Sequence, residues 1–226
     1  MAIRDEIKEQ QQKLQGKGMK EKLSYFLYYY KVHIILTLLF LILFGSFAHS
    51  LLTAKDTVLY CALISPNFYE SEDQTFTDQF AEYAKIDQNK VDITLDTGMQ
   101  INYDSDDSLT YNYVAKLMAM LSSKTLDCMV SDQKVIENFS TSDAFANLQE
   151  LLPESIQESL KGRFDYFYAK NEAGEMIPVG IILTNSKILE SSNLYKDIDM
   201  SKLIFTIAGN SSQIENSIKF LQFLTQ

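Results

Sequence analysis

Several residue types are scarce in this 226-residue sequence, and each scarcity excludes a class of protein. With only three prolines and eight glycines, the chain is neither collagen-like nor of low complexity. Its two cysteines are too few for a disulfide-rich scaffold. Basic residues number 20 against 30 acidic ones, and the net charge of −10 argues against binding to nucleic acid, whose phosphates attract a basic surface.

Groups that perform acid-base or metal chemistry are scarce as well. The two histidines, His33 and His49, fall in one long apolar run, so residues 55–226 contain no histidine base or ligand. The sequence has no G-x-S-x-G turn and no glycine-rich phosphate loop. We therefore expect a protein that is not an enzyme and that holds no cofactor.

One acidic stretch, residues 104–108, resembles the start of a calcium-binding loop because oxygen ligands stand at alternate positions. Such a loop has glycine at its sixth position and glutamate at its twelfth, whereas this chain has Leu109 and Ala115 there. The stretch is therefore expected to form a solvated loop and a helix cap, and no metal site is predicted.

Hydrophobic residues are plentiful, at 46% of the chain, and one run of them is long enough to cross a membrane. Residues 33–54 carry no charge, and these 22 residues at ~1.5 Å rise per residue span the ~30 Å hydrocarbon layer. Residues 1–33 hold seven Lys/Arg and four Asp/Glu, whereas the remainder holds 13 and 26. The positive-inside rule then predicts a single-pass protein of the cell membrane, embedded in the lipid bilayer. Its parts are a cytoplasmic basic segment (1–31), a transmembrane helix (32–54) and an extracellular domain (55–226).

Two alternatives to a retained anchor are a cleaved signal peptide and a buried core helix. Small residues around Ala48 and Ser50 suit signal-peptidase cleavage, but the long segment before the apolar run is unusual for a signal peptide. Aromatic residues at 25–30 are typical of a membrane interface, and residues 34–48 are apolar on every face. A retained anchor is therefore the favoured interpretation.

An interfacial helix is predicted immediately before the apolar run. Five apolar or aromatic residues share one helical face with lysines nearby, which is typical of a helix that runs along a membrane surface. These residues are Met19, Leu23, Phe26, Leu27 and Tyr30.

Residues 55–226 predict one α/β domain with a mainly parallel sheet and flanking helices. Its first part follows the order β-α-β-α-β, at spacings that favour parallel crossovers. Strands are expected at 57–64, 91–95 and 126–130, with helices near 76–84 and 109–121 between them. The later elements are helices at 142–150 and 153–160, strands at 164–169, 176–183 and 203–207, and a final helix from 214.

Four stretches of this domain carry a family resemblance, namely residues 126–132, 144–153, 177–189 and 218–224. Their order resembles one lobe of the bacterial extracellular solute-binding proteins of the type 2 periplasmic-binding class, over about 130 residues. The resemblance implies a single periplasmic-binding-protein-like lobe on a membrane tether. Family members carry a second lobe, for which the 13 residues between Leu189 and Leu203 leave no room. An open shelf would then replace a closed ligand cleft.

Candidate ligand-binding residues lie beyond the carboxyl ends of the strands, where open α/β sheets bind their ligands. They are Asn67, Thr97, Ser131 and Asp132, together with Tyr168 and Asn185 from the return segment. These side chains are suited to hold a small solute or the loop of another protein. Their alternative role is to form turns and cap helices.

The two cysteines, Cys61 and Cys128, fall on predicted strands that this topology would place side by side. Both a cross-strand disulfide and a pair of buried thiols are compatible with the sequence. Parallel neighbours often have poor disulfide geometry, which favours the thiols.

Two functions are compatible with these features. The first is a membrane-anchored extracytoplasmic binding or sensing domain, related to solute-binding proteins. The second is a structural or accessory subunit of a cell-envelope membrane complex, which would dock through an exposed aromatic surface such as residues 164–168.

Overall fold

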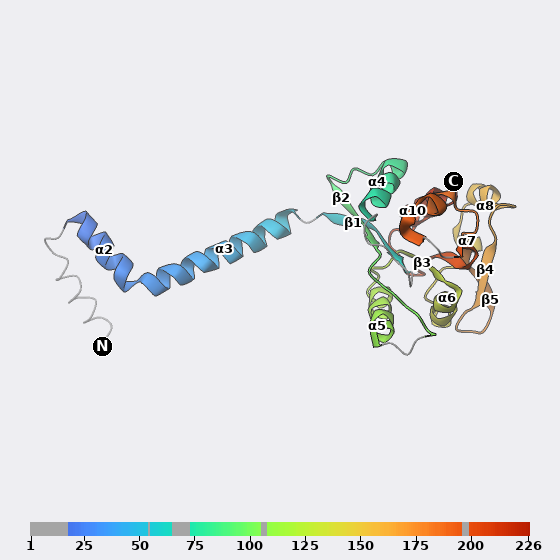
Figure 1. The fold of residues 1–226 in the computed structure, drawn as a ribbon, viewed down its shortest axis with the longest axis horizontal. Helices are drawn as coiled ribbons and strands as arrows, with labels where there is room; N and C mark the ends of the chain where they lie inside the picture. The colour runs from blue at the N-terminus through green and yellow to red at the C-terminus, as the bar shows by residue number, and fades with distance from the viewer. Residues whose placement is uncertain (1–17, 54, 65–72, 105–107, 196–198) are drawn as a thin grey trace. The chain divides into compact units, whose positions relative to one another are not determined.

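The computed structural model describes residues 18–53, 55–64, 73–104, 108–195 and 199–226. The chain divides into two compact units, Met1–Ala54 and Lys55–Gln226. The first contains α2 (Met19–Tyr29) and the long helix α3 (Lys31–Thr53), and the second contains a sheet with its own helices (Figure 1).

α3 is a helix of 23 residues that is apolar on every face. Within it, Lys31–His49 is long and apolar enough to cross a membrane, and none of this window is buried. A helix satisfies its backbone hydrogen bonds internally, as a lipid environment requires. The predicted apolar helix of membrane-crossing length is confirmed, and the alternative of a buried core helix is wrong. An anchor and a signal sequence both fit this helix.

The second unit is built on a six-stranded sheet with the order β2-β1-β3-β6-β5-β4. The strands are β1 (Asp56–Leu63), β2 (Val91–Asp96), β3 (Cys128–Asp132), β4 (Tyr166–Lys170), β5 (Met176–Ile182) and β6 (Leu203–Ile207). β1 pairs in parallel with both β2 and β3. The crossover helices are α4 (Asp73–Ala84) and α5 (Ser108–Ser122), so the predicted β-α-β-α-β order is confirmed.

The expectation of a mainly parallel sheet is wrong, because the sheet is mixed. β6 is antiparallel to both of its neighbours, β3 and β5, and β4 is antiparallel to β5. The connection between β4 and β5 is a short turn in which Gly174 has a φ of +81°, and so tight a connection forces antiparallel pairing. The place of β6 between β3 and β5 depends on contacts between segments far apart in the sequence.

The helix α6 (Gln133–Ser140) was not expected, since the sequence predicts no helix between the strand at 126–130 and residue 142. Asp132 initiates this helix, because its Oδ1 accepts a hydrogen bond from the Val135 N–H at 3.0 Å. The helix expected over 142–150 is reduced to α7 (Leu148–Leu151), and Phe145 instead forms a β-bridge with Ala208. The short helices that complete the unit are α8 (Glu154–Leu160), α9 (Lys187–Ser191), η2 (Asn193–Tyr195) and η3 (Met200–Lys202).

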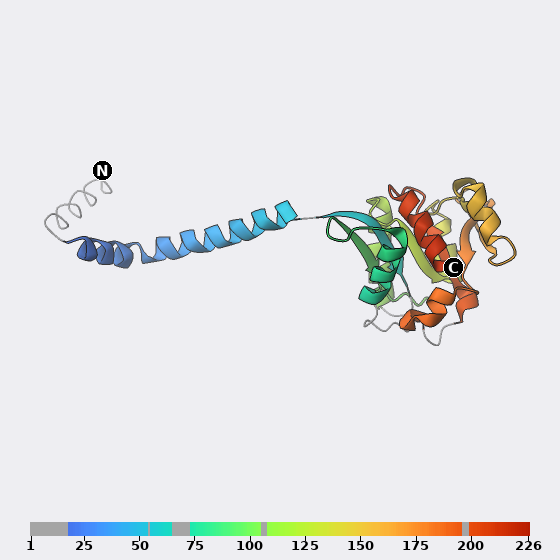
Figure 2. The ribbon, with the colours of Figure 1, turned by 90° about the horizontal axis from the view of Figure 1, so that it is seen from above.

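Apolar side chains fill both faces of the sheet. On one face, α4 packs on the C-terminal helix α10 (Ile214–Leu224), and the rings of Phe80 and Phe220 meet edge to face at 4.9 Å. On the other face, α5 and α6 bury residues such as Leu117 and Phe139 (Figures 1 and 2). The sheet is thus the central layer of a three-layer α/β unit.

Candidate functional site

The carboxyl ends of β1, β2 and β3 meet at one edge of the sheet because these strands are parallel. A cavity of about 520 Å³ lies here, at the junction of β3 and α6. Its lining is almost wholly charged and consists of Asp104, Asp132, Gln133, Lys134, Glu137 and Lys202. This cavity contains one of the predicted ligand-binding residues, Asp132.

The lysines of this cavity both have carboxylate partners. Lys134 Nζ donates to Asp104 Oδ1, and Lys202 Nζ lies 4.0 Å from Asp199 Oδ2. All four side chains are more than half exposed, so these ion pairs add little to stability. Exposed pairs of this kind exchange partners at small energetic cost, which suits recognition of a charged solute.

Lys134 and Lys202 are the functional candidates that the sequence did not reveal. Lys134 lies two residues after Asp132, in the first turn of α6. The sequence would therefore indicate Lys134 as a candidate only if α6 were recognised as a helix. Lys202 comes from a segment 70 residues further along the chain. It reaches the cavity because Leu203 is the register partner of Asp132 in the antiparallel pair of β3 and β6.

Two of the predicted residues are buried near this edge. Thr97 is 5% exposed, and Ser131 is fully buried, with a hydroxyl that has no hydrogen-bond partner among the residues described. Neither side chain therefore presents a polar group at the surface. Asn67 lies outside the described residues.

The remaining two candidates, Tyr168 and Asn185, are not brought to the cavity. Tyr168 is exposed on the edge strand β4, opposite Pro178. The Asn185 side-chain amide donates to the Arg163 carbonyl at 2.7 Å, which ties the segment after β5 to the segment before β4. The structure thus gives Asp132 and Asn185 the alternative role, helix capping and loop closure, and it does not gather the five described candidates into one pocket.

A second polar cluster lies at the end of β2. Asp96 Oδ2 accepts hydrogen bonds from the Tyr60 hydroxyl and from Lys116 Nζ, each at 2.7 Å, and its Oδ1 accepts from the Gly98 N–H. Burial opposes ionisation of Asp96, but these donors outweigh it and hold the pKa of the carboxyl below its ordinary value. Burial and the bond to Asp96 raise the pKa of Tyr60. These three donors hold the Asp96 carboxylate in place and tie the end of β2 to β1 and α5.

Asp127 forms a buried tie between segments far apart in the chain. It is 4% exposed, and its carboxylate accepts from the Tyr60 N–H at 2.8 Å and from the Ser211 hydroxyl at 2.6 Å. These bonds join β1, the segment before β3, and the loop between β6 and α10. These two hydrogen bonds offset the cost of burying the Asp127 carboxylate, which would destabilise the fold if it had no partner.

Cys61 and Cys128 are register partners on β1 and β3, and both are free thiols buried in the core. Burial, followed by the neighbouring Cys61, raises the pKa of the Cys128 thiol. Of the two interpretations left open by the sequence, the structure contains the buried thiols. Such thiols are poor nucleophiles because the reactive species is the thiolate.

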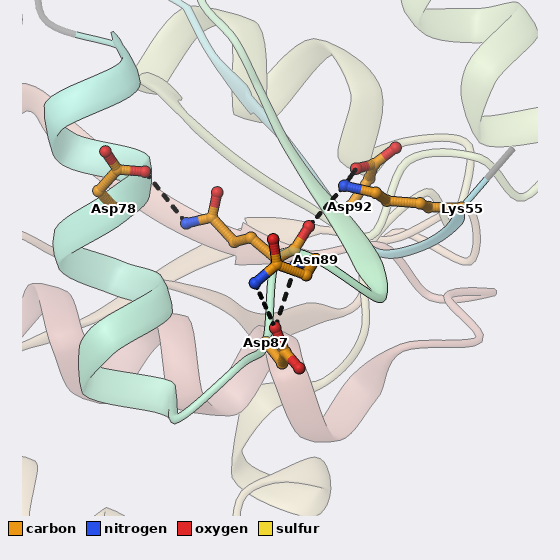
Figure 3. A network of polar contacts seen from close by, with 6 residues as sticks. Lys55, Asp78, Asp87, Asn89 and Asp92 are labelled. Carbon is orange, nitrogen blue, oxygen red and sulfur yellow. Dashed lines mark hydrogen bonds and ion pairs between the residues drawn. The ribbon is translucent and has the colours of Figure 1, made fainter. Parts of the chain in front are cut away.

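The first residue of the second unit is held by a surface network on the neighbouring strand (Figure 3). Lys55 Nζ donates to the Gln88 carbonyl at 2.6 Å and lies 3.8 Å from Asp92 Oδ1. Gln88 in turn donates to Asp78 on α4. Lys55 therefore lies beside β2 and contacts the turn that precedes this strand.

An uncharged surface lies on α5. Its outer residues include Tyr111 and Met118, which are 65% and 54% exposed, and the one charged side chain of this helix is Lys116, bound to Asp96. Met118 also borders a cavity of about 640 Å³, whose other apolar walls include Phe139 and Phe145. Exposed apolar side chains beside a cavity are a common mark of an interaction site.

Comparisons with protein-family models, with curated proteins and with solved structures find no match to this chain. Within the parts of the chain that the structure describes, no three His, Cys, Asp or Glu side chains cluster in a way that would hold a metal ion. The features of this chain that indicate a function are the exposed helix, the charged cavity and the α5 surface.

Proposed function

We propose that this chain is a single-pass protein of the cell membrane that displays an extracytoplasmic binding or sensing domain. The observation that carries the proposal is an exposed apolar helix of membrane-crossing length directly before a separate α/β unit. The basic residues before this helix and the acidic domain after it favour a cytoplasmic N-terminus and an extracellular C-terminal domain. The resemblance to solute-binding proteins supports binding and no catalysis.

The ligand that fits best is a small charged solute, held in the cavity at the junction of β3 and α6. Both charge signs line this cavity, so it matches a ligand that itself carries both, such as an amino acid or a short peptide. Parallel strand ends are where open α/β sheets hold their ligands. The described residues that line this cavity all come from the one α/β unit, so the contact is open and the affinity modest.

Thermal unfolding of residues 55–226 in the presence of amino acids, short peptides and sugars tests this function. A ligand at about 100 times its Kd stabilises a folded domain by about 2.7 kcal/mol, which raises the Tm by several degrees. Lys202→Gln should abolish the shift, whereas Lys161→Gln, outside the cavity, should preserve it. If no compound raises the Tm, solute binding is refuted.

A second candidate function is an accessory subunit of an envelope membrane complex, and the apolar surface of α5 favours it. Residues 164–168, the surface expected for docking, suit it less well, because Phe164 and Phe167 are buried. Recovery of one stoichiometric membrane protein with the full chain, lost in Met118→Asp and kept in Met176→Asp, would support this function. Absence of any such protein would refute it.

A further inference from the structure

The helix α2 carries an apolar stripe that faces solvent. Met19, Leu23 and Leu27 follow one another at intervals of four residues and so lie on one side of the helix. Their side chains are 89%, 59% and 48% exposed. Three large apolar side chains in one row are costly to leave in water, so this face is expected to meet a partner.

A positive charge borders the stripe. Lys20 lies seven residues before Leu27, about two helical turns, so it borders the same face. A lysine in this position can lay its aliphatic stem along an apolar surface and extend its ammonium group toward an anion. Residues 16–33 contain four lysines and a single acid, Glu21.

The position of α2 indicates what this partner is. Only Tyr30 separates it from α3, and the Tyr30 carbonyl accepts the Ile34 N–H at 2.8 Å. The rings of Tyr30 and His33 contact each other with centroids 6.1 Å apart, and aromatic residues of this kind settle at the level of lipid headgroups. If α3 spans the bilayer, the C-terminal end of α2 lies at the membrane surface, where lipid is the nearest neighbour.

We propose that α2 lies along the cytoplasmic surface of the membrane, with its Met19–Leu23–Leu27 stripe in the interface and its lysines on anionic lipid phosphates. This proposal rests on the transmembrane assignment of α3 made above. The proposal also specifies anionic lipid as the partner, because the apolar stripe alone would bind neutral and anionic bilayers equally. The lysines distinguish the two, since each is worth about fivefold in partitioning onto an anionic surface.

The charges elsewhere in the chain fit this arrangement. Residues 1–33 hold seven Lys/Arg and four acids, whereas residues 55–226 hold 13 Lys/Arg and 26 acids. An anionic surface therefore attracts the segment that contains α2 and repels the globular domain. Anionic lipid would favour the predicted orientation as well as the position of α2.

Lipid contact can be measured on the full chain reconstituted into vesicles. Cys61 and Cys128 are buried, so a cysteine introduced into α2 can be labelled selectively with a fluorophore. We place the label at Leu23→Cys, in the stripe, and at Tyr28→Cys, a control position on another side of the same helix that is 84% exposed. Quenching by nitroxide-labelled lipid then reports which side of α2 contacts the bilayer.

In vesicles that contain phosphatidylglycerol, we expect the label at position 23 to be quenched several-fold more than the label at position 28. Replacing the anionic lipid by phosphatidylcholine should reduce this difference, as should about 1 M NaCl, which shortens the Debye length to about 3 Å. Lys20→Gln should weaken partitioning of α2 about fivefold, whereas Lys161→Gln in the domain should not.

Equal quenching at the two positions in phosphatidylglycerol vesicles would overturn the proposal. Equal results in phosphatidylglycerol and phosphatidylcholine would overturn its anionic-lipid part. A third label, at Leu38→Cys within α3, distinguishes failure of the proposal for α2 from failure of the transmembrane assignment of α3. If Leu38→Cys is quenched and Leu23→Cys is not, only the proposal for α2 fails; if neither is quenched, the transmembrane assignment fails with it.

Discussion

In the half of the sheet formed by β2, β1 and β3, long helical crossovers join parallel strands, whereas in the other half a hairpin turn joins β4 to β5. The parallel half is tied together by carboxylates, Asp96 and Asp127, each of which accepts hydrogen bonds from other segments. The antiparallel half instead depends on close approach of backbones, most clearly at Gly180. The same sheet is thus stabilised by polar ties on one side and by steric fit on the other.

The largest expected effect is in the parallel half, at Asp127. Asp127→Ala leaves the Tyr60 N–H and the Ser211 hydroxyl without their acceptor, so we expect a loss of about 3 kcal/mol in the free energy of unfolding. Urea unfolding of residues 55–226 measures this loss. The exposed Asp165→Ala serves as a control and should change stability little; a loss at Asp127 no larger than at Asp165 would contradict the role of the tie.

The next effect is in the antiparallel half, at Gly180. A Cβ at this position would lie 3.0 Å from the Phe205 carbonyl oxygen and collide with the Ile204 side chain, so Gly180→Ala should cost about 2 kcal/mol. The matched control is Gly98→Ala in the parallel half, where the nearest atom would be 3.5 Å away. Comparable unfolding midpoints in urea for the two variants would show that steric fit does not distinguish the halves.

The smallest effect depends on pH and involves Asp96. Its folded-state pKa lies below its ordinary value, so ionised Asp96 contributes stability above about pH 4, and this contribution is lost as the pH falls through the folded pKa. Asp96→Asn should therefore cost about 1 kcal/mol at pH 7, and the difference from the wild type should shrink toward pH 3. Urea unfolding at a series of pH values checks this; a difference independent of pH would exclude the ionised carboxylate as its source.

The parallel half could be predicted from the sequence because each of its elements has a local pattern. The continuous apolar run at 57–64 predicts the strand β1, and the helical spacing of apolar residues at 109–121 predicts the helix α5. β6 has an equally clear strand pattern, but its antiparallel place between β3 and β5 depends on pairing with distant segments. The helix α6 was missed, although it buries Val135, Ile136 and Phe139, because Asp132 was interpreted as a ligand at a strand end and not as the N-cap of a helix.

The candidate site was predicted only in part for the same reason. Asp132 could be placed at a strand end from the sequence, and it does border the charged cavity. Lys202 could not, because only the pairing of Leu203 with Asp132 brings it there. Ser131 and Thr97 were predicted as ligands from their polarity and position, but polarity alone does not reveal that they are buried.

We propose that an N-terminal helix anchors the chain while the acidic domain lies outside the cell. A membrane-impermeant maleimide, applied to intact spheroplasts that express single-cysteine variants, tests it most directly, since the native cysteines are buried. The exposed positions 20 and 158 serve as reporters on the two sides of α3. We predict that Glu158→Cys is labelled in intact spheroplasts and that Lys20→Cys is labelled only after lysis. Labelling of Glu158→Cys only after lysis would contradict the account.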